Sequence, residues 1–530
     1  MNALHTGTTL MRRDWKPFYW SLSIMLLLTL QLCCGTEPAF AALVALFCLL
    51  TYGAVVAVGG LMSLIGATVF CLAAQNVLVS QVAKVLFWQP ADSHLLQPLT
   101  TMGVYDAGMF GIYLAVVLFK RTRLARRPPL FAPETDPTRL MWIAYISTAL
   151  FLFQALFTRA TAVNAETGAQ TTGGLFGLLQ AVVFLFPLAV ASGTAYTISS
   201  SQGRRSIGPV NLVPLVVVVV LGIIGANREA LPDAVGIYFL TCYAFRFRFR
   251  PIHLGVILVG AYVAQFIFFP YALYARSIVR TPDVQKNIQI AVGALIDVIS
   301  DPVKYQQLAY ESKKKTPWKF YYYGKPYPTL DRFSQINVAD AVIDVATRQC
   351  DSEMDTITPG FLTVPPRFLL PDKPIGSPNT VIAHRVPGML NKKDHGTGIS
   401  MGFFCDSFAS FSWLGAFCIP FLIMFSLLWA YSLVISLRLW QNIYALCFIL
   451  MMPHAFSEAT IAAQIPLILQ TPLVFAAVVY FILFLVSFAM RAQVRIQEAK
   501  QRQARLGGAR LLSRKLSLPQ GGPIGGNDAG

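Results

Sequence analysis

Apolar residues in this 530-residue chain gather in long runs, and short polar segments rich in Arg and Lys separate these runs. A membrane-spanning helix needs about 20 mostly apolar residues, and twelve of the runs are roughly that long. The predicted spans cover residues 18–35, 39–58, 61–81, 103–119, 140–158, 174–197, 209–225, 230–245, 252–274, 411–436, 442–459 and 466–490. We therefore expect an all-α polytopic membrane protein with about 12 transmembrane helices.

The composition supports this interpretation, because only 13% of the residues are charged and 55% are hydrophobic. Soluble domains have about 25% charged residues. The first apolar run follows Arg12, Arg13 and Lys16, and the second begins almost at once. We expect the first run to be a retained helix rather than a cleaved signal peptide.

The net charge of +17 could indicate nucleic-acid binding, but its distribution along the chain indicates membrane topology. If the N-terminus is cytoplasmic, the cytoplasmic segments hold 23 Lys and Arg, and the short outer loops hold three, Lys84, Arg159 and Arg228. The positive-inside rule then places both termini in the cytoplasm. No nucleic-acid partner is expected.

Residues 275–410 carry the other 16 Lys and Arg, and they are expected to form a large extracytoplasmic loop domain, because long loops are translocated regardless of charge. The stretches "VQKNIQIAVGALIDVIS" and "VADAVIDVATRQC" in this loop have the pattern of amphipathic helices. The predicted organisation is helices 1–9 in residues 1–274, the periplasmic loop domain in 275–410, helices 10–12 in 411–490, and a basic cytoplasmic tail in 491–530 that anionic lipid attracts.

Ionisable residues within the predicted spans cluster toward the outer ends of the helices, and such residues tend to mark functional sites. They include Asp106, Asp233, His454 and Glu458, whereas the bilayer-centre positions hold amides such as Gln154, Gln180 and Gln265. An ion-coupled transporter needs its polar site near the midplane. The pattern therefore favours chemistry or binding at the outer surface, although each group could also be an ordinary interfacial residue.

The loop adds cations and aromatic residues. Arg332, Arg367 and Lys373 could bind a pyrophosphate, and the prolines of "VPPRFLLPDKPIGSPN" would hold the last two in a fixed geometry. A solvated basic loop or a rigid packing strap would have the same pattern. Trp318 and Tyr322 could contact sugar rings, form an interfacial belt or pack a core.

Cysteine and histidine give little further guidance. Cys350 and Cys405 both lie in the predicted outer loop, where they could form a disulfide or remain free. His384 and His395 lack the ligand spacing of a zinc site, and we predict no metal site. No cofactor is predicted either, because the chain has no P-loop or dinucleotide-binding motif.

Three motifs give the chain a family resemblance. They are Gly225 and Arg228 in "GANREAL", the segment Pro366-Arg367 followed by Pro371-Asp372-Lys373-Pro374, and "FFCDSFASFSWLGAF", which leads into a late helix. With these motifs, in residues 220–430, the chain resembles the O-antigen polymerase (Wzy-like) family, the oligosaccharide repeat-unit polymerases of bacterial polysaccharide biosynthesis. It departs from the family in the last motif, where a carboxylate is usually followed by Asn-Phe-Gly and Asp406 here is not.

The resemblance implies an integral-membrane glycosyltransferase of the bacterial inner membrane that polymerises repeat units linked to polyprenyl pyrophosphate. Its partners would be this lipid-linked glycan, membrane lipid and other polysaccharide assembly proteins. The reaction needs a base for the acceptor hydroxyl and cations for the leaving group. The candidate bases are Glu458, His454, Asp406 and Asp106, and the candidate substrate-binding residues are Arg228, Arg332, Arg367, Lys373, Trp318 and Tyr322.

Three other functions stay open. An exporter or flippase of lipid-linked saccharide is disfavoured by the apolar midplane and the large loop. A transferase similar to O-antigen ligase would perform the same chemistry on a different acceptor. The third alternative is a non-catalytic assembly protein.

Overall fold

The structure is a computed structural model that describes residues 17–161, 182–225, 230–249, 251–278, 284–314, 321–325, 327, 330–348, 354, 357–365, 370, 383–390, 399 and 401–516. Across these residues the regular structure is helical, and the only β-type pairings are two isolated bridges. The fold divides into two compact units, residues 1–478 and residues 479–530.

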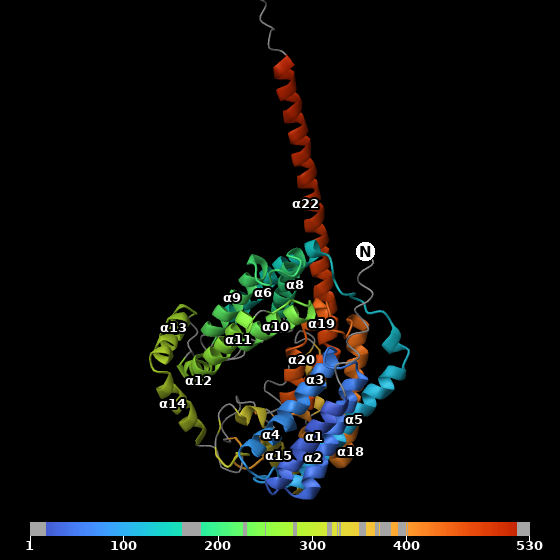
Figure 1. Cartoon of the computed structure of the whole chain (residues 1–530), viewed down its shortest axis with the longest axis vertical. Coiled ribbons are helices and arrows are strands. Elements are labelled where there is room, and N and C mark those ends of the chain that lie inside the picture. The colour runs from blue at the N-terminus through green and yellow to red at the C-terminus, as the bar shows by residue number, and fades with distance from the viewer. Residues whose placement is uncertain are drawn as a thin grey trace, which may run out of the picture. The chain divides into compact units, whose positions relative to one another are not determined.

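One group of helices in the first unit packs around α5 (Pro98–Arg121), which contacts α2 (Pro38–Ala57) and α18 (Phe403–Val434) (Figure 1). A proline in the first turn starts both α2 and α5, because its fixed φ suits that position and its missing N–H is not needed there. The other members of this group are α1 (Pro17–Cys33), α3 (Leu64–Ala73), the π-helix η3 (Ala74–Leu78) and α4 (Val79–Leu86).

A second group consists of α6 (Pro137–Thr161), α8 (Leu185–Ser200), α9 (Pro209–Ile224) and α10 (Ala230–Ala244), which pack on one another (Figure 1). The chain continues through α11 (Pro251–Val263), the π-helix η5 (Ala264–Phe268) and α12 (Phe269–Ile278). Two further helices, α13 (Val284–Ser300) and α14 (Pro302–Lys314), lie beside α12.

The remaining helices complete the first unit and lead into the second. They are the short 3₁₀ helices η4 (Leu124–Arg126) and η7 (Leu330–Phe333), α15 (Ile336–Arg348), α16 (Thr358–Thr363), α19 (Ile443–Leu446), α20 (Met451–Glu458), α21 (Ile461–Leu469) and α22 (Thr471–Leu516). Within α18 the helix breaks at Phe411 and Ser412, where Ser412 has a φ of 53°. The predicted span 411–436 begins at this break, and the helix itself begins eight residues earlier.

Seven helices among the described residues are long and apolar enough to cross a membrane, so the chain is an all-helical membrane protein by its sequence and its fold. These candidate spans are Pro38–Ala57, Leu64–Leu86, Pro98–Arg121, Pro137–Phe157, Ile257–Ala275, Phe403–Val434 and Ile461–Gln501. Four further apolar helical segments are shorter, namely Tyr19–Cys33, Pro209–Ile224, Ile288–Ser300 and Ile443–Glu458. The sequence predicted twelve spans. One of them, residues 442–459, is not a continuous helix, because the chain there forms α19, turns and α20.

The two ends of α5 lie in different surroundings. Its N-terminal end contacts α15, which belongs to the segment 275–410. Its last turn holds Lys120 and Arg121, and cations at a helix C-terminus interact favourably with the helix dipole. The chain then continues into η4, which contacts α18. The first end is called the α15 end and the second the basic end.

Candidate functional site

Glu458 lies at the last residue of α20, where the chain breaks before α21. Its Oε1 accepts a hydrogen bond of 2.8 Å from Nε2 of Gln75 in η3, and it lies 3.7 Å from Nδ1 of His454, one turn earlier in α20. The side chains of His454 and Glu458 are 52% and 22% exposed. Two of the four base candidates of the sequence are therefore neighbours, and both side chains are at least partly exposed.

Asp406 contacts α21, the helix that follows this break. Its Oδ2 accepts a hydrogen bond of 2.8 Å from the backbone N–H of Ile461, the first residue of α21, and the residue is fully buried. A carboxylate at a helix N-terminus pairs with an N–H that lacks an intrahelical partner and with the positive end of the helix dipole. The contact gives Asp406 a capping function, in contrast to the more accessible Glu458.

The π-helix η3 brings a second amide to this place. Asn76 accepts a hydrogen bond of 3.2 Å from Oη of Tyr105 in α5 and donates one to the carbonyl of Leu72. π-Helical turns often occur at functional sites because the extra residue redirects side chains. Here the turn carries both Gln75 and Asn76, so η3, α5 and α20 contribute to one polar cluster, which we define as Gln75, Asn76, Tyr105, His454 and Glu458.

Asp106, the fourth base candidate, is not joined to the cluster by any hydrogen bond in the described structure. It is buried in α5 next to Tyr105, and it interacts electrostatically with the Cys48 thiol of α2. Neither of its carboxylate oxygens has a hydrogen-bond partner among the described residues.

Tyr322 is fully buried, so it presents no surface to a sugar in this conformation. Its hydroxyl donates to the carbonyl of Ala91 and accepts a hydrogen bond of 3.1 Å from Nε2 of Gln81. Nζ of Lys84 lies 4.3 Å from the centre of its ring. Tyr322 thus packs the 321–325 segment onto α4 and the loop that follows it. This is the core-packing role, one of the three alternatives that the sequence left open for Trp318 and Tyr322.

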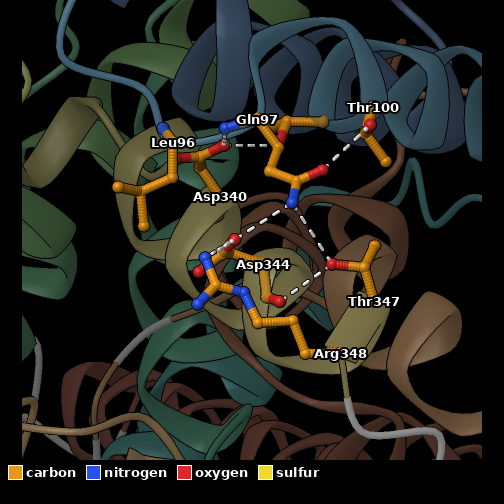
Figure 2. Close-up of polar contacts among 8 residues, drawn as sticks. Leu96, Gln97, Thr100, Asp340, Asp344, Thr347 and Arg348 are labelled. Atoms are coloured by element: carbon orange, nitrogen blue, oxygen red, sulfur yellow. Dashed lines mark hydrogen bonds and ion pairs between the residues drawn. The ribbon is translucent and has the colours of Figure 1, made fainter.

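A contact that the sequence does not reveal joins α15 to the α15 end of α5. The carboxylate of Asp340 accepts hydrogen bonds from the backbone N–H groups of Leu96 (2.5 Å) and Gln97 (2.9 Å) (Figure 2). It also accepts one of 2.7 Å from the hydroxyl of Thr101. Gln97 is the N-cap residue of α5, so Asp340 caps that helix from another element. Burial raises the pKa of Asp340, and its hydrogen bonds with Leu96, Thr101 and Gln97 oppose the shift.

Asp344 extends the same contact by one helical turn. Its Oδ1 accepts a hydrogen bond of 3.0 Å from Nε2 of Gln97 and forms an ion pair of 2.8 Å with Arg348 (Figure 2). Nothing in the local sequence pairs Asp340 or Asp344 with residues about 240 positions away. An amphipathic α15 was predicted, but its partner was not.

Several sequence candidates lie outside the described residues, namely Arg228, Arg367, Lys373, Trp318 and Cys350. The backbone of Arg332 lies in η7, and its side chain is outside the described set. Cys405 is a free, buried thiol that donates to the carbonyls of Met401 and Gly402, so the disulfide that the sequence allows is not formed here. Among the described residues, no group of three or more His, Cys, Asp or Glu side chains could hold a metal ion.

Comparison with protein-family models, curated proteins and solved structures finds no match for this chain. The resemblance to the O-antigen polymerase family therefore rests on the sequence motifs alone.

Proposed function

We propose that the protein polymerises polyprenyl-pyrophosphate-linked repeat units at the outer face of a bacterial inner membrane. The observation that supports this most is the His454–Glu458 pair, an accessible carboxylate and imidazole at the outer end of predicted helix 11. Glycosyl transfer needs a base to take the proton of the attacking hydroxyl. Glu458 serves as that base, and Gln75 and His454 position it.

The leaving polyprenyl pyrophosphate needs cations, because negative charge develops on it as the glycosidic bond breaks. Arg228, Arg367 and Lys373 are the proposed cations, followed by Arg332. The acceptor hydroxyl attacks the anomeric carbon of the donor, the hydroxyl proton passes to Glu458, and polyprenyl pyrophosphate departs. Twelve spans, cytoplasmic termini and an extracytoplasmic 275–410 loop are part of this proposal.

The test is the length of polymer made by cells in which Glu458→Gln replaces the wild-type protein at equal membrane abundance. Glutamine keeps the size of the side chain but cannot take a proton. Loss of a general base slows a reaction by roughly 10²–10⁴-fold, so single repeat units should replace the long chains. The matched control is Glu37→Gln, an exposed carboxylate at the start of α2 with no capping hydrogen bond, which should leave polymer length unchanged. Normal polymer from Glu458→Gln would remove Glu458 from the reaction.

A second candidate, export of the lipid-linked unit, is favoured by the interrupted helices. Transporters often build substrate sites from discontinuous membrane helices. The break within α18 at Phe411–Ser412 and the break between α20 and α21 are of this kind. The two functions differ in cells that lack the protein, because loss of a polymerase leaves single units on the outer leaflet and loss of an exporter leaves them on the inner leaflet. Labelling of spheroplasts with a membrane-impermeant lectin distinguishes these outcomes.

A further inference from the structure

Helix α13 has three faces with different surroundings. One face is packed against protein, where Ala294 and Val298 join Tyr271 and Ala275 of α12 in a buried cluster. Ala291 lies on the same face and is also buried. Ile223 of α9 packs against this cluster as well. The helix is therefore held in a defined orientation by two apolar helices.

The second face is apolar and exposed. It consists of Ile288, Val292, Ile296 and Ile299, whose exposed fractions are 38%, 46%, 57% and 54%. At about 100° per residue, these four side chains fall within an arc of about 80°. Scattered exposed aliphatic residues are ordinary, but four on one stripe of one helix form a continuous apolar surface.

The third face is polar and exposed, and it comprises Lys286, Gln289, Asp297 and Ser300. On the same helical projection it occupies the next arc of about 80°, between the apolar stripe and the packed side chains. A helix whose circumference divides into protein-facing, apolar and polar arcs has the geometry of a helix lying in a membrane interface.

The position of α13 in the chain favours lipid as the occupant of the apolar stripe. Only residues 279–283 separate α12, the end of the candidate span Ile257–Ala275, from α13, and so short a segment reaches at most about 20 Å. The helices that hold α13 also expose aliphatic side chains, such as Leu273 on α12 and Val220 on α9. The apolar stripe of α13 therefore lies beside helices that also expose aliphatic side chains.

We propose that α13 lies in the plane of the membrane interface, with Ile288, Val292, Ile296 and Ile299 among the lipid acyl chains and Gln289, Asp297 and Ser300 in water. The helix then anchors the start of the segment 275–410 to the bilayer rather than belonging to a fully aqueous loop. This inference concerns the membrane contact of the helix and does not depend on the proposed reaction.

The test uses nitroxide spin labels on single cysteines in the full-length protein, with the accessible native cysteines replaced, in phosphatidylcholine vesicles. Labels at Val292 and Ile296 report the apolar stripe, labels at Gln289 and Asp297 report the polar face, and a label at Ala294 reports the packed face. Oxygen concentrates among acyl chains, and a water-soluble nickel chelate stays outside. The ratio of oxygen to nickel accessibility should be on the order of tenfold higher at Val292 and Ile296 than at Gln289 and Asp297.

Two results would overturn the proposal. Nickel accessibility at Val292 and Ile296 equal to that at Gln289 would place the stripe in water. Low accessibility to both reagents, together with dipolar broadening between labels, would show that a second copy of the chain covers the stripe. Each labelled variant is compared with the parent by size-exclusion chromatography in detergent, and a substitution that disturbs the fold is replaced by one at Ile288 or Ile299 on the same face.

Discussion

The four base candidates share one sequence signal, an ionisable group toward the outer end of an apolar run, yet the structure gives them different surroundings. Asp406 is buried and caps α21, whereas Asp106 is buried beside α2. His454 and Glu458 form an accessible pair. The pairing could be predicted from their spacing of four residues within one helix. The contacts of Asp406 and Gln75 could not, because they join residues far apart in the chain.

Gly402 is a residue whose importance only the three-dimensional structure reveals. It has a φ of 76°, and a Cβ at this position would lie 3.0 Å from Oδ1 of Asn76 and 3.2 Å from the carbonyl oxygen of Ser457. Gly402→Ala should destabilise the protein by about 1–3 kcal/mol, because a side chain at positive φ is strained and these oxygens are crowded. The measurement is thermal unfolding of the purified protein in detergent.

The matched control for that variant is Gly293→Ala in α13, where a Cβ would meet nothing within 4 Å. Alanine in a helix interior is more favourable than glycine by roughly 0.5–1 kcal/mol, so the control should be neutral or slightly stabilising. Equal unfolding temperatures for Gly402→Ala and the wild type would show that residue 402 does not need glycine.

At the scale of single elements, apolar run length and amphipathic periodicity predicted most helices that the structure contains. The amphipathic stretches around α13 and α15 were also recognised. The π-helices η3 and η5 and the break at Phe411–Ser412 were not predicted. Hydrophobic periodicity reports which face is apolar, and it does not register one inserted residue or one left-handed backbone position.

The contact between α15 and α5 is an element-scale feature with a measurable energy. Asp340→Asn places an amide NH₂ group among three donors, so the N–H groups of Leu96 and Gln97 cannot both keep a side-chain acceptor. Leaving a buried donor without a partner costs about 1–3 kcal/mol. Asp344→Asn, one turn away, should cost less, because Asp344 accepts from side chains only and its ion-pair partner Arg348 is largely exposed. Chemical denaturation of both variants provides the comparison.

The cost of Asp340→Asn should also depend on pH. The raised pKa of Asp340 means that the folded protein holds this proton more tightly than the unfolded chain does. Its contribution to the free energy of unfolding is therefore fully present below the ordinary pKa of Asp and decreases as the pH rises through the raised value. Asparagine does not titrate, so the difference between wild type and variant should be larger near pH 4 than near pH 7. A difference that grows with pH would contradict this assignment.

At the scale of the whole molecule, the charge pattern and the fold agree on two distinct ends. Lys120 and Arg121 end α5 at the basic end, and Arg438 follows α18, whose last turn accepts a hydrogen bond from the backbone N–H of Leu130, soon after η4. Glu458, Asp406 and Asp340 lie toward the opposite ends of their neighbouring helices. Lys84, counted with the outer loops in the sequence, lies in α4 and donates hydrogen bonds to Ser93. The sequence could predict this polarity, because it depends on composition at helix ends and not on contacts between helices.

The last prediction concerns the side of the membrane on which these two ends lie. The bias of 23 Lys and Arg against three in the short loops predicts that the basic end lies in the cytoplasm and the polar cluster outside. Alkaline phosphatase is active only outside the cytoplasm, so fusion after Gly324 should give active enzyme and fusion after Arg510 should give inactive enzyme. A fusion after Arg205, in a predicted cytoplasmic loop, is the matched inactive control, and immunoblots confirm equal amounts of each fusion. Activity after Arg510 would show that the tail lies outside the cytoplasm. The number of spans would then be odd, or the whole orientation would be inverted. Inactivity after Gly324 would place the α15 end, with Asp340 and Glu458, on the cytoplasmic side, where lipid-linked units are built and not joined, and the polymerase proposal would fall with the topology.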